Sequence, residues 1–246
     1  MKRLAVATLF IIALSSFSLT AFAQSQSREE ILKEIQAKRT ELQALETQFL
    51  SVSDGDRAAF ADFLRQPDTG LIRLLPRELY DSETYKKNSK TITMRGAGAY
   101  YSFTRLTHEY GYGSDIQLES GYLSVGFAGF DYGILLKLGD VPLQDVSLES
   151  PAARFVSLYS PPVPEPEVRI EQRRFGTGST VDGIVYKNRV LAEEKTTFLL
   201  RSINYERTDV LVALRVIRKD TDDSLIILWK LLKKYPAPAV ARETAR

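Results

Sequence analysis

Three apolar runs near the end of the chain decide the expected fold: TFLLRSINY (197–205), VLVALRVIR (210–218) and SLIILWKLLK (224–233). Each run is rich in Val, Ile and Leu, which favour β-strands. Only the polar segments ERTD (206–209) and KDTDD (219–223) separate them, and connections this short join antiparallel neighbours. The sequence therefore predicts an antiparallel meander of three strands.

Apolar side chains occupy both alternating sets of positions in 210–217 and in 225–232. Successive side chains of a strand point to opposite faces, so these runs predict that at least one strand is covered on both faces. The amphipathic helices expected earlier in the chain are the candidates for covering the second face.

A helix is expected near the start of the chain, from residue 27 to about residue 49. Ser27 followed by Glu30 is a capping-box pattern. The spacing that follows is a heptad seam, in which Arg28 and Lys38 take two of the core positions. The seam supports two interpretations, namely association with another helix or packing on the helix's own domain. Its apolar members are Ile31, Ile35, Leu42, Leu45 and Phe49.

A second helix is expected at 54–66, ended by Pro67, and a short buried apolar run at 71–75. Further strands are expected between glycine turns, and the fold class is α+β, as one unit or as two small β subdomains behind a helical segment. Those strands are 99–104, 116–118, 122–127 and 132–138. The expected organisation is a signal peptide (1–23), a helical segment (24–66), a Gly/Tyr-rich β region (67–150), a Pro-rich extended connection (151–166), the meander region (167–235) and a disordered tail (236–246).

The start of the chain has the three parts of a secretory signal peptide. A positive pair at 2–3 precedes an apolar run at 4–14, and Ala21-Phe22-Ala23 is an A-x-A cleavage site. An uncleaved anchor is the alternative, but the apolar run is shorter than the roughly 18 residues that span a membrane. We therefore expect cleavage before Gln24, no membrane span afterwards, and a location in the periplasm or outside the cell.

Composition limits the chemistry of the mature chain. The sequence contains no cysteine, which excludes disulfides, thiolate metal sites and a cysteine nucleophile. Loss of the signal peptide removes two basic residues and lowers the formal net charge from +2 to 0. A neutral, exported chain has no electrostatic reason to bind nucleic acid.

Catalytic motifs are weak in this sequence. His108 is its single histidine, and neither a nucleophile elbow nor an H-E-x-x-H metal motif is present, so no metal or other cofactor is expected. Glu109, Asp115 and Asp131 lie in a tyrosine-rich neighbourhood, where a carboxylic acid with a raised pKa could act on a sugar. A carbohydrate-active hydrolase that uses Glu109 with Asp115 or Asp131 is therefore an alternative function.

Glycine and aromatic residues are concentrated between residues 96 and 133, which hold eight of the 14 glycines and nine aromatic residues. This density suits a binding surface, for a glycan for example, but it is also typical of tightly packed β-hairpins. The candidate binding residues are Arg95, Tyr100, Tyr101, Arg105, His108, Tyr110 and Tyr112.

Three functions are compatible with these patterns. The first is a secreted or periplasmic non-catalytic binding protein, whose N-terminal helix mediates self-association or docking to an envelope protein. The second is the carbohydrate-active hydrolase, and the third is an envelope structural protein without a small ligand.

Overall fold

The computed structural model describes residues 27–81, 95–108, 110 and 113–241, so the expected signal peptide lies outside the described residues. The chain divides into two compact units, Met1–Ala44 and Leu45–Arg246. The helices are α1 (Arg28–Phe49), α2 (Asp54–Ala59), α3 (Ala61–Leu64), α4 (Arg77–Asp81), α6 (Pro151–Leu158) and α7 (Glu165–Thr177), with 3-10 turns η1 (Arg95–Gly98) and η2 (Leu143–Asp145).

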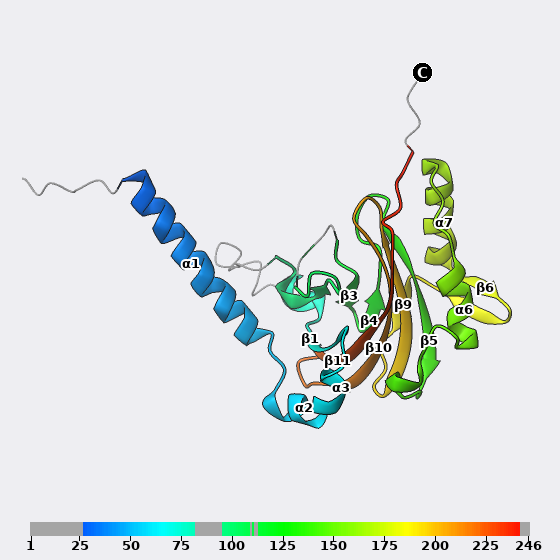
Figure 1. The fold of residues 1–246 in the computed structure, drawn as a ribbon, viewed down its shortest axis with the longest axis horizontal. Helices are drawn as coiled ribbons and strands as arrows, with labels where there is room; N and C mark the ends of the chain where they lie inside the picture. Colours follow the sequence, from blue (N-terminus) through cyan, green and yellow to red (C-terminus); the bar gives the residue numbers. More distant parts are fainter. Residues whose placement is uncertain (1–26, 82–94, 109, 111–112, 242–246) are drawn as a thin grey trace, which may run out of the picture. The chain divides into compact units, whose positions relative to one another are not determined.

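The strands form three antiparallel sheets, which confirms the expected α+β class (Figure 1). The largest sheet has five strands in the order β1-β11-β10-β9-β5, a second has four in the order β2-β3-β4-β8, and β6 and β7 form a hairpin. Their bounds are β1 (Thr69–Leu74), β2 (Tyr100–Tyr101), β3 (Ile116–Glu119), β4 (Tyr122–Ser124), β5 (Tyr132–Gly139), β6 (Ser179–Val181), β7 (Ile184–Tyr186), β8 (Arg189–Leu191), β9 (Thr196–Asn204), β10 (Thr208–Lys219) and β11 (Leu225–Tyr235).

The predicted meander is confirmed as β9, β10 and β11, with Leu211 opposite Arg201 and Leu214 opposite Trp229. Two hydrophobic clusters, one on each face of the five-stranded sheet, use alternate residues of these strands. On β10, Leu211 and Ala213 belong to the first cluster, whereas Val212 and Leu214 belong to the second. Both faces are therefore covered, as the two-sided apolar pattern requires.

The elements that cover the two faces of the five-stranded sheet differ in part from the expected ones. Figure 1 shows α6 and α7 on one side of the five-stranded sheet and the strands β3 and β4 on the other. Ile116, Leu118 and Leu123 of the small sheet join the second cluster, while Val156 and Phe175 of α6 and α7 join the first. The second face is thus covered by another sheet, whereas the first face is covered by α6 and α7 together with Phe60, Phe63 and Leu64 of the helix expected at 54–66.

The Pro-rich connection is also different from the expectation. Residues 151–158 form α6, and α7 begins at Glu165 with Pro166 in its first turn. Proline is compatible with a first helical turn because the backbone N–H that it lacks has no partner inside the helix there. Proline-rich composition therefore marks two helix starts here, with a short extended segment between them.

The expected second helix is divided into α2 and α3, since Phe60 leaves helical geometry at φ −113° and ψ 18°. The tail from Pro236 is held as far as the structure describes it, up to Ala241. The Glu206 N–H donates to the Pro238 carbonyl at 2.8 Å, and the Ala241 N–H donates to the Val163 carbonyl at 2.9 Å. These bonds connect the tail to the turn between β9 and β10 and to the extended segment before α7.

Candidate functional site

Helix α1 carries the exposed apolar stripe that the sequence predicts. Its capping box is present: the Ser27 N–H donates to the Glu30 carboxylate at 2.8 Å, and the Glu30 N–H donates to Ser27 Oγ at 3.2 Å. No residue of α1, all of which the structure describes, is buried. Leu42 is half-buried, and the other seam residues have large exposed fractions: Ile31 42%, Ile35 41%, Leu45 56% and Phe49 57%.

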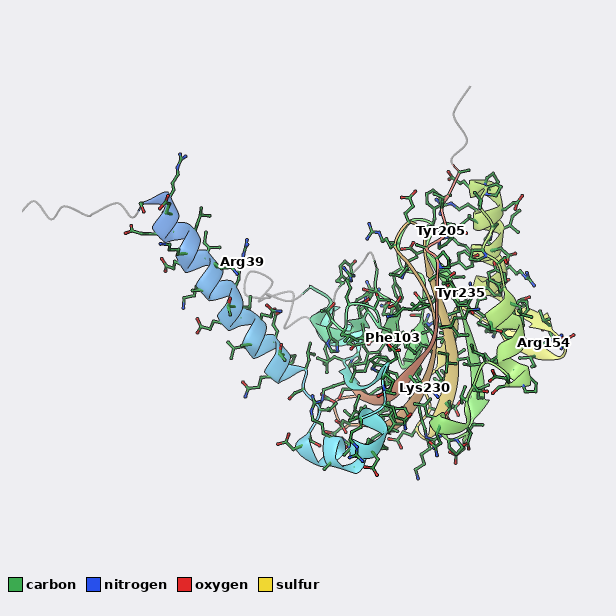
Figure 2. All side chains as sticks on the ribbon, in the orientation of Figure 1. Arg39, Phe103, Arg154, Tyr205, Lys230 and Tyr235 are labelled. Carbon is green, nitrogen blue, oxygen red and sulfur yellow. The ribbon has the colours of Figure 1, made fainter. Side chains whose placement is uncertain are left out.

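Charged side chains accompany this stripe. The Lys38 ammonium lies 2.9 Å from the Glu41 carboxylate, and this hydrogen bond raises the pKa of Lys38 and lowers that of Glu41. Figure 2 shows Arg39 projecting from α1. The helix therefore presents an apolar seam beside charges of both signs, the pattern of a helix that binds another helix.

The Gly/Tyr-rich region has its most prominent tyrosines inside the fold. Tyr100 and Tyr101 are 4% and 5% exposed. The Tyr101 ring contacts Phe103, with centroids 5.3 Å apart, and Trp229 of the five-stranded sheet, at 6.4 Å. Tyr101 thus packs between the sheets, and the Tyr100 ring packs against Phe127, with centroids 5.4 Å apart. A ligand on the surface would not reach these two side chains.

His108 forms a hydrogen bond with the edge strand of the five-stranded sheet. Its Nε2 lies 2.7 Å from the carbonyl oxygen of Arg73 on the edge strand β1, and its ring packs against Tyr101 at 5.0 Å. Burial lowers the pKa of His108, so the neutral ring with a proton on Nε2 is the form that donates to this carbonyl. The contact satisfies a backbone acceptor on an edge strand.

The remaining candidate binding residues are only partly described. Arg105 is exposed, and Tyr110 is 51% exposed with its ring 4.9 Å from Tyr100. Arg95 begins the turn η1, but its side chain is outside the described part of the structure. Glu109 and Tyr112 lie outside the described residues as well.

Close packing accounts for two of the glycines. A Cβ at Gly70 would lie 2.5 Å from the Trp229 ring, which is its cross-strand partner. A Cβ at Gly133 would lie 1.7 Å from Val125 Cγ2 and 2.4 Å from the Arg201 carbonyl oxygen. Glycine is required where another chain segment or a large ring approaches the backbone this closely.

Asp115 has no exposed surface and is surrounded by donors. Its carboxylate accepts from the Phe103 N–H at 2.7 Å and from Asn204 Nδ2 at 3.1 Å, and Ser102 and Ser202 donate to it as well. Burial nevertheless raises the pKa of Asp115 to about 6. A general acid must contact its substrate, whereas this carboxyl group has no exposed surface.

Asp131 lies close enough to interact electrostatically with Asp115. Its carboxylate accepts from the Tyr205 N–H at 3.1 Å, and the side chain is 8% exposed. Burial and, to a smaller extent, the charge of Asp115 raise its pKa to about 6, while Arg207 opposes the rise. The structure therefore brings together two of the three carboxylates selected from the sequence, at a buried position.

A buried tyrosine cluster was missed in the sequence. The hydroxyl groups of Tyr132 and Tyr159 are 2.7 Å apart, Tyr159 donates to Glu171 at 2.7 Å, and Tyr205 lies beside Tyr132 with ring centroids 6.2 Å apart. Figure 2 labels Tyr205, the member nearest the chain's end. These residues are widely separated along the chain, and no local spacing links them.

An open groove borders this cluster on the surface of α7. Its lining combines apolar side chains with two glutamates, and Ile170 in it is 53% exposed. The lining residues are Tyr159, Ser160, Pro162, Glu167, Ile170, Glu171 and Arg174.

The described part of the chain contains neither a candidate metal site nor a candidate membrane-spanning helix. Within it, histidine and carboxylate side chains form no group of three or more that could hold a metal ion. No helix among the described residues is long and apolar enough to cross a membrane. Comparison with protein-family models, curated proteins and solved structures found no match to this chain.

Proposed function

We propose that the protein is an exported, non-catalytic binding or structural protein whose copies associate through α1. The observation that carries this proposal is the exposed heptad seam of α1. The structure describes every residue of this helix, and none of them is buried. Residues of the second unit supply the two hydrophobic clusters without any contribution from α1. The seam is therefore available for a second helix.

Association would stabilise both the complex and the helix itself. Complete burial of one Leu or Ile side chain contributes roughly 1.5–3 kcal/mol, and the seam contains four aliphatic residues and one phenylalanine. Isolated helices of ~12–15 residues are only marginally stable in water. Helix α1 has 22 residues and would gain further order from a partner. The seam thus supports association without requiring a ligand.

The molar mass of the mature protein in solution tests this proposal. Wild type should have a mass that is a multiple of the monomer, and Ile35→Lys/Leu42→Lys should reduce it to the monomer because ammonium groups replace seam side chains. Gln36→Lys/Thr40→Lys adds the same charge on the opposite side of the helix and should leave the mass unchanged. A monomeric wild type at every concentration would contradict the proposal.

The carbohydrate-active alternative depends on Glu109, which is outside the described residues, and it stays a prediction. Assays of wild type and Glu109→Gln on envelope polysaccharides test it directly. Hydrolysis by wild type that is lost in the variant would favour the enzyme over the binding protein.

A further inference from the structure

We infer that the partner of α1 is α1 of a second copy, paired in parallel and in register. This inference rests on the proposed function and adds the direction and the register of the pairing. In the heptad notation, seam positions are a and d, and the flanking positions e and g carry the charges that choose the orientation. Positions a are Arg28, Ile35, Leu42 and Phe49, and positions d are Ile31, Lys38 and Leu45.

Parallel pairing places opposite charges together at the middle of the helix. In this arrangement a g residue faces the e residue five positions later on the second copy. Glu34 is a g residue and Arg39 an e residue, so each Glu34 meets Arg39 of the second copy. Two attractive pairs form, one on each side of the seam.

The next g and e positions are both acidic, but a lysine compensates for one of them. Glu41 would face Glu46 of the second copy, which taken alone is repulsive. Lys38 binds Glu41 at 2.9 Å on the same helix, which neutralises one of these carboxylates. The same contact draws the Lys38 ammonium toward the flank of the seam, where its long stem can cover apolar surface.

Antiparallel pairing offers no such attraction at full overlap. There g faces g and e faces e, so Arg39 would meet Arg39 and Glu41 would meet Glu41. If one antiparallel helix is shifted by one heptad in one direction, Glu34 lies opposite Glu41 of the second copy, and the two carboxylates repel. A shift in the other direction leaves less than two heptads of the two helices in contact. The e and g charges on α1 therefore favour the parallel arrangement, although that arrangement also places Arg28 and Lys38 opposite their own counterparts in the seam.

Cross-linking tests the direction, because the chain has no cysteine of its own. In the parallel pair, Arg28→Cys places two thiols at facing seam positions and should form a disulfide-linked dimer under mild oxidation. In the full-overlap antiparallel pair these thiols would be more than about 30 Å apart. Gln36→Cys, on the outer side of the helix, is the matched control and should cross-link at least about tenfold more slowly.

Charge exchange gives an independent readout. Glu34→Arg should weaken association roughly tenfold, since it turns two attractive pairs into repulsive ones. Glu34→Arg/Arg39→Glu should restore the wild-type affinity in a parallel pair, whereas an antiparallel pair would not recover.

The results separate this inference from the proposed function. A dimeric mass without the Arg28→Cys cross-link, or without recovery in the double variant, overturns the parallel arrangement and leaves self-association in place. A monomeric wild type overturns both.

Discussion

Arg201 and Asp209 form a buried ion pair with two hydrogen bonds, Nε to Oδ1 at 2.9 Å and Nη2 to Oδ2 at 2.8 Å. Their side chains are only 1% and 2% exposed. Arg201 Nη1 also donates to the carbonyls of Val156 and Tyr159, at 2.7 and 2.6 Å, at the C-terminal end of α6. One guanidinium group on β9 thereby pairs with a carboxylate on β10 and satisfies helix carbonyls that have no partner within α6.

Asp209→Ala should lower the free energy of unfolding by about 3–5 kcal/mol, because it leaves the Arg201 charge buried without its counter-ion. Urea denaturation measures this change. Asp62→Ala is the control, since the Asp62–Arg65 pair has side chains that are 91% and 73% exposed. We expect the control to change stability by less than about 1 kcal/mol. Equal effects of the two substitutions would contradict the role assigned to the buried pair.

Gly133→Ala should destabilise the protein by at least about 1–3 kcal/mol, because the added methyl group would overlap Val125 and the Arg201 carbonyl. Gly55→Ala is the comparison: its Cβ would meet only Ser53 Oγ at 3.8 Å, within α2. There the change should be neutral or stabilising by roughly 0.5–1 kcal/mol. Melting temperatures of the two variants should therefore move apart, and a shared direction of change would count against this account.

Stability should fall between about pH 4 and pH 6.5 through the buried carboxyl groups. Asp115 and Asp131 have pKa values of about 6 in the fold, above the unfolded value near 4. A raised pKa of this kind contributes stability that is complete below about pH 4 and is lost as pH rises through about 6. For Asp115 the difference between the two limits is about 2–3 kcal/mol. Half-buried His108, whose pKa is lowered by burial, acts in the opposite direction, because its contribution grows as pH rises toward the ordinary histidine pKa of about 6.5.

The comparison of wild type with Asp115→Asn isolates the carboxyl contribution from that of His108. We expect the variant to lose stability less steeply than wild type between pH 4 and pH 6.5, measured by urea denaturation at each pH. Parallel pH profiles would refute the buried-carboxyl explanation.

A second pH effect should be visible in strong acid. Two hydrogen bonds from Arg218 to Asp56, at 2.7 and 3.0 Å, lower the pKa of Asp56 to about 2. This group contributes stability above about pH 4 that is lost as pH falls through about 2. Asp56→Asn should flatten the decline below pH 4 and leave the decline above pH 5 unchanged, which denaturation at matched pH values would show.

Export should yield a mature chain that begins at Gln24, because the A-x-A site ends at Ala23. Cell fractionation followed by N-terminal sequencing checks this expectation. Ala23→Pro should block cleavage and leave a longer chain, since proline at the cleavage position does not fit the small-residue requirement of that site. A full-length wild-type chain in the cytoplasm would overturn the prediction.

Local patterns predicted those parts of the fold that depend on near neighbours. The meander followed from apolar runs separated by short polar turns, and the start of α1 from the reciprocal spacing of Ser27 and Glu30. Helices α6 and α7 were missed because proline usually indicates extended chain, although it is also compatible with a helix start. The sequence left open whether Tyr100 is buried, because an aromatic side chain has the same local pattern in a core and on a surface.

The sequence by itself determined the strand meander, the two-sided cover that it requires and the heptad seam of α1, since all three follow from the periodicity of apolar residues along one element. Only the tertiary structure decided that a second sheet covers one face, that Asp115 and Asp131 are buried near each other, and that Arg201 pairs with Asp209. The physical reason is that packing and the energy of a buried charge depend on residues that folding brings together, whatever their separation in the chain.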